Sequence, residues 1–175
     1  MNNLFDTINP KDLNENVIRA IGYEWMLITA GSKSHYNTMT AAWGGIGYLW
    51  NLPVSYIFVR PQRFTFEYTE QYDNYSLCFF DKTYKKDLMY CGRNSGRDVN
   101  KAKETKLTAI ESPNGLISFE EARLIIDCKK IYADDIKELN FLDKSVDQKV
   151  YPEKDYHRMY IGEIKSIYKR KTILK

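Results

Sequence analysis

Several features that would classify a chain at once are missing from these 175 residues. No apolar run approaches the roughly 20 residues that a membrane-spanning helix needs, so we expect no membrane partner. The N-terminal segment, residues 1–6, has no basic stretch followed by an apolar one, which indicates that no signal peptide is present. We therefore expect a cytoplasmic protein.

Cysteine and histidine are scarce. The three cysteines are Cys78, Cys91 and Cys128, and no two of them have the CxxC spacing of a zinc or redox motif. With only two histidines in addition, the sequence predicts no metal site and three free, partly buried thiols. Cys91 has no resolving cysteine near it in the sequence, which argues against a redox role for this thiol.

Two common catalytic motifs and a large excess of one charge are also absent. No GxGxxG follows a predicted strand, which excludes a Rossmann nucleotide site, and the acyl-transfer signature GxSxG is absent. The 26 basic and 23 acidic residues leave a net charge of only +3. A small barrel that binds single-stranded nucleic acid is an alternative from another class of protein, and this small charge disfavours it. We therefore expect no nucleic-acid partner.

Aromatic residues, by contrast, are abundant, with 14 Tyr, 8 Phe and 3 Trp. They pack well on half-buried pleated surfaces and also form flat walls for planar ligands. The length suits one domain with a real core, so we expect a single domain over residues 1–175. Residues 1–20 are expected to form a lead-in, and residues 165–175 a basic tail.

Segments with high β-propensity recur along the chain without regular helical crossovers between them. This pattern predicts a mainly β fold, a mostly antiparallel barrel with short helices, rather than a doubly wound parallel sheet. The predicted strands are 25–30, 37–43, 56–59, 75–80, 107–110, 122–132 and 156–168. The predicted short helices are 11–20, 65–71 with Thr65 as N-cap, 98–103 with Asp98 as cap, and 136–141.

The segment from Asn37 to Pro53 has an unusual composition. Small and polar residues lead up to Trp43, and three glycines follow within four positions. Small residues let another group approach the backbone closely, while Trp43 and Trp50 supply flat apolar faces. A planar heteroaromatic ligand lying along this strand would explain the combination. A barrel corner that needs glycine to bend is the alternative.

Two further segments have the composition of an anion site. The run from Arg60 to Thr65 brings two guanidiniums, a hydroxyl and free helix N–H groups to the start of a predicted helix, as phosphate binding requires. The run from Ser95 to Asp98, with Lys101 one turn further on, is also suited to an anion. The alternatives are two surface arginines in the first segment and an exposed loop in the second.

Together these segments resemble the flavin-reductase-like, flavoredoxin-type family, in the right order and over nearly the whole chain. The resemblance is carried by residues 37–45, Trp50, Pro53, 59–65, 90–92, 95–98, Lys101 and 155–164. Each motif is loose alone, but four in sequence are fairly specific. The family implies a split β-barrel of Greek-key-like topology that binds FMN. It also implies a homodimer with flavin sites near the subunit interface.

The resemblance implies roles for individual residues as well. The residues assigned to the wall along the isoalloxazine ring and ribityl chain are Asn37, Met39, Thr40, Ala41, Ala42 and Trp43. Those assigned to binding the phosphate are Arg60, Arg63 and Thr65. Ser95, Arg97 and Lys101 are weaker candidates, which would reach a flavin held mainly by the other subunit. His157 matches a histidine of the last strand that can lie near the flavin in related barrels. It is the one candidate for a catalytic role, and a structural role is the alternative.

The leading hypothesis is therefore an FMN-dependent oxidoreductase. Electrons would come from a reduced nicotinamide, NADH or NADPH, or from another donor, and would pass through FMN to an acceptor such as a protein partner. A non-catalytic FMN carrier that only a protein partner reduces is the alternative. In both cases the hydride chemistry belongs to the flavin, and the protein supplies position, a dry stacking face and electrostatics.

Overall fold

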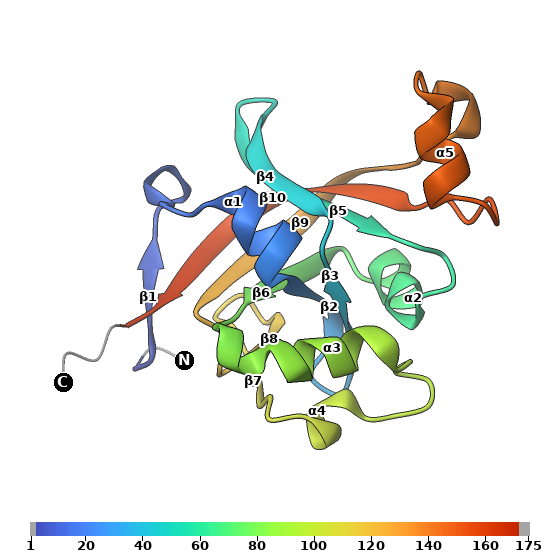
Figure 1. Cartoon of the computed structure of the whole chain (residues 1–175). Helices are drawn as coiled ribbons and strands as arrows, with labels where there is room; N and C mark the ends of the chain where they lie inside the picture. Colours follow the sequence, from blue (N-terminus) through green and yellow to red (C-terminus); the bar gives the residue numbers. More distant parts are fainter. Residues whose placement is uncertain (1–2, 172–175) are drawn as a thin grey trace.

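The computed structural model describes residues 3–171, and Figure 1 shows how the elements are arranged. The strands are β1 (Phe5–Ile8), β2 (Met26–Ser32), β3 (His35–Ala41), β4 (Gly44–Leu49), β5 (Leu52–Val59), β6 (Asn74–Phe79), β7 (Ala109–Glu111), β8 (Ile117–Phe119), β9 (Leu124–Asp135) and β10 (Arg158–Arg170). The α-helices are α1 (Val17–Arg19), α2 (Phe64–Gln71), α3 (Lys85–Arg93), α4 (Lys101–Glu104) and α5 (Lys144–Val150). The predicted mainly β fold with short helices is confirmed.

One 8-stranded sheet forms the body of the molecule, and every neighbouring pair in it is antiparallel. Its order is β3-β2-β6-β9-β10-β5-β4, with β1 paired to β10 off this path. The long strand β10 joins two parts of the sheet. Along one edge it pairs with β9, while its other edge pairs first with β5 and then, from Ile167 to Arg170, with β1.

The central strands are buried on both faces, because the sheet packs on two apolar clusters. In β2, Met26 and Ile28 belong to one cluster, while Leu27 belongs to the other. In β6, Leu77 and Cys78 divide in the same way. Successive side chains of a strand point to opposite faces, so covering both faces requires a continuous apolar run rather than alternation.

All seven predicted strands are present with shifted ends, whereas β1, β4 and β8 were not predicted. The glycines around residue 45, expected only to close the preceding strand, form β4 themselves. Their small size fits this place, because a Cβ at Gly45 or Gly47 would lie 3.4 or 3.5 Å from the Tyr56 ring on β5. The two glycines therefore leave room for the Tyr56 ring over this part of β4.

The start of α2 differs from the prediction. Arg63 occupies the N-cap position, so Thr65 lies inside the first turn and is not the cap. The Thr65 hydroxyl instead accepts a hydrogen bond from Asn37 Nδ2 on β3 at 2.7 Å. The Thr65 side chain therefore makes a tertiary hydrogen bond to Asn37 instead of the helix cap that the local sequence predicts.

The remaining helix predictions were less accurate. The segment 11–20 divides into a 3-10 turn at Pro10–Asp12, the short α1 and a π-helical turn at Ala20–Glu24. Asn100, not Asp98, caps α4, and residues 136–141 contain only a 3-10 turn, Glu138–Asn140. Helices α3 and α5 were not predicted at all.

Both chain ends contribute to the sheet where the structure describes them. Part of the expected lead-in forms β1, and residues 165–170 of the expected basic tail belong to β10. Residues 172–175 of that tail lie outside the described residues. Within the described range 3–171, no helix is both long enough and apolar enough to span a bilayer.

Candidate functional site

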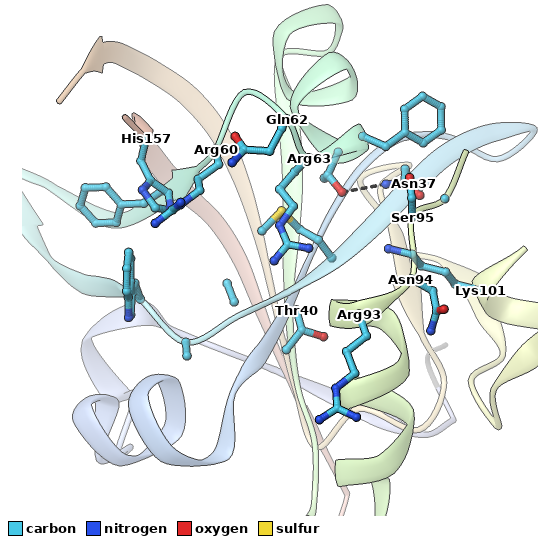
Figure 2. A pocket seen from close by; sticks show the side chains of 18 residues that line it. Asn37, Thr40, Arg60, Gln62, Arg63, Arg93, Asn94, Ser95, Lys101 and His157 are labelled. Atoms are coloured by element: carbon cyan, nitrogen blue, oxygen red, sulfur yellow. Dashed lines mark hydrogen bonds between the residues drawn. The ribbon is translucent and has the colours of Figure 1, made fainter. Parts of the chain in front are cut away.

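A cavity of about 540 Å³ opens between β3, the start of α2 and the end of α3. Small-molecule sites typically have volumes of roughly 300–1,000 Å³, so this cavity has the size of a ligand site. Figure 2 shows side chains from distant segments of the chain converging on it. The predicted site residues that line it are Asn37, Met39, Thr40, Ala41, Ala42, Trp43, Arg60, Arg63, Thr65, Ser95, Lys101 and His157.

The wall formed by β3 includes the small residues Thr40 and Ala41, and α3 lies close against it. The Thr40 hydroxyl donates a hydrogen bond to the Leu88 carbonyl of α3, which holds the helix against the strand. A Cβ at Gly92 would lie only 3.2 Å from Thr40 Cβ. Glycine at this position therefore lets the end of α3 approach the wall closely.

The loop after α3 closes the cavity at the other side of β3. A Cβ on Gly96 would fall 1.9 Å from Asn37 Oδ1, so no other residue fits there without displacing Asn37. Asn37 in turn holds Thr65 at the start of α2. The N-cap residue Arg63 offers no side-chain acceptor, which leaves the first N–H groups of α2 for a bound anion or solvent.

One end of the cavity concentrates positive charge. Arg63, Arg93 and Lys101 all line it, and in the described part of the chain none of the three forms an ion pair with a carboxylate. Arg63 Nη1 donates to the Gly92 carbonyl at 2.8 Å, a bond that orients the guanidinium without neutralising it. These three residues are called the cationic end below.

Lys101 is the most buried of these cations, with 7% of its surface exposed. Its Nζ donates to the carbonyls of Thr38 at 2.6 Å and Cys91 at 2.8 Å. Burial lowers the pKa of Lys101 to about 8, and the nearby Arg63 guanidinium lowers it too. An ammonium has three donors, so one remains for a ligand.

Arg60 lines the same cavity, but its charge is already paired with a carboxylate. Its guanidinium forms an ion pair with Asp155, which also accepts a hydrogen bond from Gln62. A second nitrogen, Nη2, donates to the Val150 carbonyl at 3.0 Å. The assignment of Arg60 to a phosphate grip is thus weakened, since its charge is balanced by a carboxylate before any ligand arrives.

The opposite end of the cavity is aromatic. Trp43, 49% exposed, and His157, 7% exposed, have ring centroids 5.1 Å apart. His157 Nδ1 lies 2.8 Å from the Tyr151 hydroxyl. Burial lowers the pKa of His157 to about 4, with a further lowering from Arg60, so the ring is neutral near pH 7. These residues are called the aromatic end below.

Arg97 is the one predicted cofactor-binding residue that does not line the cavity. It forms an ion pair with Glu67 of α2 and lies with its guanidinium carbon 4.7 Å from the centre of the Phe64 ring. These contacts direct it along the outside of α2. Ser95, two residues earlier, does line the cavity.

Six lining residues were not predicted. Arg93 and Asn94 end and follow α3, a helix that the sequence did not reveal because its residues are mostly polar. The full set is Phe58, Gln62, Phe64, Arg93, Asn94 and Gly96. All six lie within or directly beside the segments 59–65, 90–92 and 95–98 already singled out, so the position of those segments was an available signal for them.

Two alternative chemistries find little support in these side chains. Burial raises the pKa of Cys91 to about 11, which leaves a thiol rather than a reactive thiolate at neutral pH. In the part of the chain that the structure describes, no group of three or more His, Cys, Asp or Glu residues could hold a metal ion. The cavity offers cations, hydroxyls and flat walls instead.

This arrangement can be compared with known proteins. The sequence matches the family described as flavin reductase like domain over residues 18–174. The chain belongs to the flavin reductase-like family. The match spans most of the chain, so it includes the segments that form the cavity.

Solved structures agree with this family on the fold. A flavoredoxin from Methanosarcina acetivorans is 20% identical, with a TM-score of 0.66, over 97% of this chain and 78% of its own. An FMN-binding protein from Thermus thermophilus with bound 1-cyclohex-2-enone is 16% identical, with a TM-score of 0.65, over 90% and 78%. A split-barrel protein from Shewanella frigidimarina assigned as a flavin reductase is 16% identical, with a TM-score of 0.65, over 95% and 79%.

The flavin reductase-like chain described here therefore has the split-barrel fold, and its family supports a flavin-related redox function. A search of the curated proteins found no match. The cavity residues fit a flavin phosphate on their own chemistry. Unpaired cations at one end and the Gly96 cradle beside the start of α2 provide donors for an anion.

Proposed function

We propose that this protein binds FMN in the cavity and passes electrons from a reduced nicotinamide or another donor, through the flavin, to an acceptor. The observation that carries the proposal is the cationic end. Three cations that have no carboxylate partner among residues 3–171 line a site that also has small residues along one wall, and FMN combines a phosphate with a planar ring. The similarity to proteins named as FMN-binding and flavoredoxin supports the same ligand.

Each part of the cavity has a task under this proposal. Arg63, Lys101 and the first N–H groups of α2 hold the phosphate, with the hydroxyls of Thr65 and Ser95 nearby. The wall from Met39 on β3 to Trp43 just after it orients the ring and excludes water from one face. The flavin, when bound, supplies the hydride chemistry, and the protein adds position and electrostatics.

An absorbance titration tests this function. Purified protein mixed with FMN should show a shifted flavin band, which NADH or NADPH should bleach in the absence of oxygen. A failure to bind FMN would contradict the ligand assignment. Bound FMN that no reduced nicotinamide bleaches would contradict the reductase activity and leave the second candidate, an FMN carrier that a protein partner reduces.

Exposed aromatic rings at the β4–β5 hairpin favour a protein–protein interface there. Tyr48 is 71% exposed and Trp50 is 56% exposed, and the Trp50 ring meets Tyr132 of β9 with centroids 6.1 Å apart. Large exposed apolar side chains of this kind are typical of interfaces. We propose a homodimer, as in the family, and light scattering during size-exclusion chromatography tests it: a monomer mass at working concentration would contradict it.

A further inference from the structure

The aromatic end contains a hydrogen-bonded pair of side chains, Tyr151 and His157, that the proposed function does not use. Tyr151 follows α5 directly, and its side chain is buried with 4% exposed surface. Its hydroxyl lies 2.8 Å from His157 Nδ1, just before β10. Figure 2 shows His157 reaching the cavity beside Arg60.

The surroundings of the Tyr151 hydroxyl decide which atom of the pair donates. Among residues 3–171, His157 Nδ1 is the one side-chain hydrogen-bond partner of this hydroxyl. A protonated Nδ1 would leave the phenolic proton of this buried side chain without an acceptor, so Nδ1 accepts and the hydroxyl donates. A neutral imidazole that accepts at Nδ1 carries its proton on Nε2.

The His157 ring borders the ligand space. His157 lines the cavity next to Trp43, and among residues 3–171 no hydrogen bond to its Nε2 is formed. The charged groups facing the ring are Arg60, Arg63 and Asp155. Burial and the arginines lower the pKa of His157 to about 4, although Asp155 opposes them, so the neutral tautomers are the relevant forms near pH 7.

We infer that Tyr151 is a positioning residue, which fixes His157 as the tautomer with its N–H on Nε2 and so presents a neutral hydrogen-bond donor to a carbonyl oxygen of the ligand. The inference rests on the proposed function only for the identity of that ligand. The carbonyl belongs either to the flavin ring or to a second substrate. In both cases the donor keeps its proton throughout the neutral pH range, because it does not depend on an imidazolium.

Nitrogen-15 NMR on histidine-labelled protein measures the tautomer directly. The chain has only two histidines, and His35→Gln removes the signals of the other one, so the assignment is unambiguous. The wild-type protein should show His157 with a protonated Nε2 and an unprotonated Nδ1 near neutral pH. A protonated Nδ1, or an imidazolium at that pH, overturns the inference.

Tyr151→Phe removes the donor while keeping the ring. The Nδ1 and Nε2 shifts of His157 should then move toward a mixture of the two tautomers. Tyr156→Phe is the matched control, because the Tyr156 hydroxyl donates to Asp147 at 2.8 Å while its ring packs on Tyr151 at 4.8 Å. Unchanged His157 shifts in Tyr151→Phe, or equal changes in both variants, overturn the positioning role. If Tyr151→Phe does not fold, the tautomer of His157 measured in the wild-type protein still tests the inference.

Two additions identify the source of the carbonyl oxygen. FMN alone should move the Nε2–H resonance if the flavin ring is the acceptor, whereas benzamide added to FMN-loaded protein should move it if a second substrate is. A resonance that neither compound moves overturns the ligand-facing part of the inference. Loss of FMN binding, seen in the absorbance titration, contradicts the proposed function but leaves the tautomer measured in the free protein unaffected.

Discussion

The two ends of the cavity use arginine in opposite ways. At the cationic end, Arg63 keeps its charge unpaired and makes one hydrogen bond to a carbonyl. At the aromatic end, Arg60 is neutralised by Asp155 and donates a hydrogen bond to the carbonyl of Val150, the last residue of α5. The two residues are three positions apart in one short segment, yet one is free to bind an anion and the other supports the structure around His157.

The difference teaches that a cation next to a cavity marks a binding site only when no carboxylate balances its charge. A charge-assisted hydrogen bond to a ligand is favourable when the protein has not already satisfied the donor. Arg97 makes the same point outside the cavity, since it is paired with Glu67. Four variants test the distinction, in order of decreasing expected effect on FMN affinity.

Arg63→Ala should have the largest effect. Losing a charge-assisted contact costs about 1.5–3 kcal/mol, which corresponds to a rise of roughly 10- to 150-fold in the Kd for FMN. Flavin fluorescence titration measures it. Arg97→Ala is the matched control, because it removes an arginine of the same region whose charge is already paired. An Arg63→Ala variant that binds like wild type would remove Arg63 from the phosphate site.

Lys101 should make FMN binding depend on pH. The pKa of Lys101 is lowered to about 8, below its unfolded value, so the free protein carries this charge below pH 8 and loses it above. The phosphate, with a second pKa of about 6, stays a dianion there. The Kd for FMN should therefore rise between pH 7 and 9, by roughly fivefold to tenfold for a lost contact of about 1 to 1.4 kcal/mol.

Two comparisons control for other groups that titrate in this range. Riboflavin lacks the phosphate, so its Kd should not follow the titration of Lys101. Lys101→Met should bind FMN more weakly at pH 7 and show no rise toward pH 9. A rise that persists in Lys101→Met would assign the pH dependence to another group.

Arg93→Ala should have a smaller effect, because Arg93 is exposed at the end of α3 and, among residues 3–171, no hydrogen bond orients its guanidinium in the way that the Gly92 carbonyl orients that of Arg63. Contacts between charges near the surface are typically worth about 0.2–1 kcal/mol. The Kd for FMN should rise by no more than about fivefold, and the rise should shrink in high salt because exposed charges are screened. A loss as large as that of Arg63→Ala would give Arg93 an equal share in phosphate binding.

Arg60→Ala should change FMN affinity least, by less than about twofold, if its charge is committed to Asp155. Its effect should appear in stability instead, as a loss of about 1 kcal/mol in the free energy of unfolding measured with urea. Asp155→Asn should lower stability similarly, and the double variant should cost less than the sum. An affinity loss matching that of Arg63→Ala would end the distinction between the two ends.

Prediction from sequence succeeded where a signal is local. The seven predicted strands are all present, because β-branched and aromatic runs favour strands wherever they pack. Helices α3 and α5 were missed: most of their residues are polar, and the short apolar run Leu88–Cys91 of α3 was not recognised as one face of a helix. Thr65 was expected to cap α2 from its position alone. Its hydroxyl instead accepts a hydrogen bond from Asn37, which lies 28 residues away in the sequence.

The sequence alone determined the class of this protein: a mainly β chain with a glycine-flanked strand, two basic segments and the order of motifs of the flavin reductase-like family. The tertiary structure decided which charges are free. Arg60 and Arg63 look alike along the chain, and the residue that distinguishes them, Asp155, lies 95 positions after Arg60. Pairing depends on distance in space, which a linear order of residues does not specify until the sheet brings β5 and β10 together.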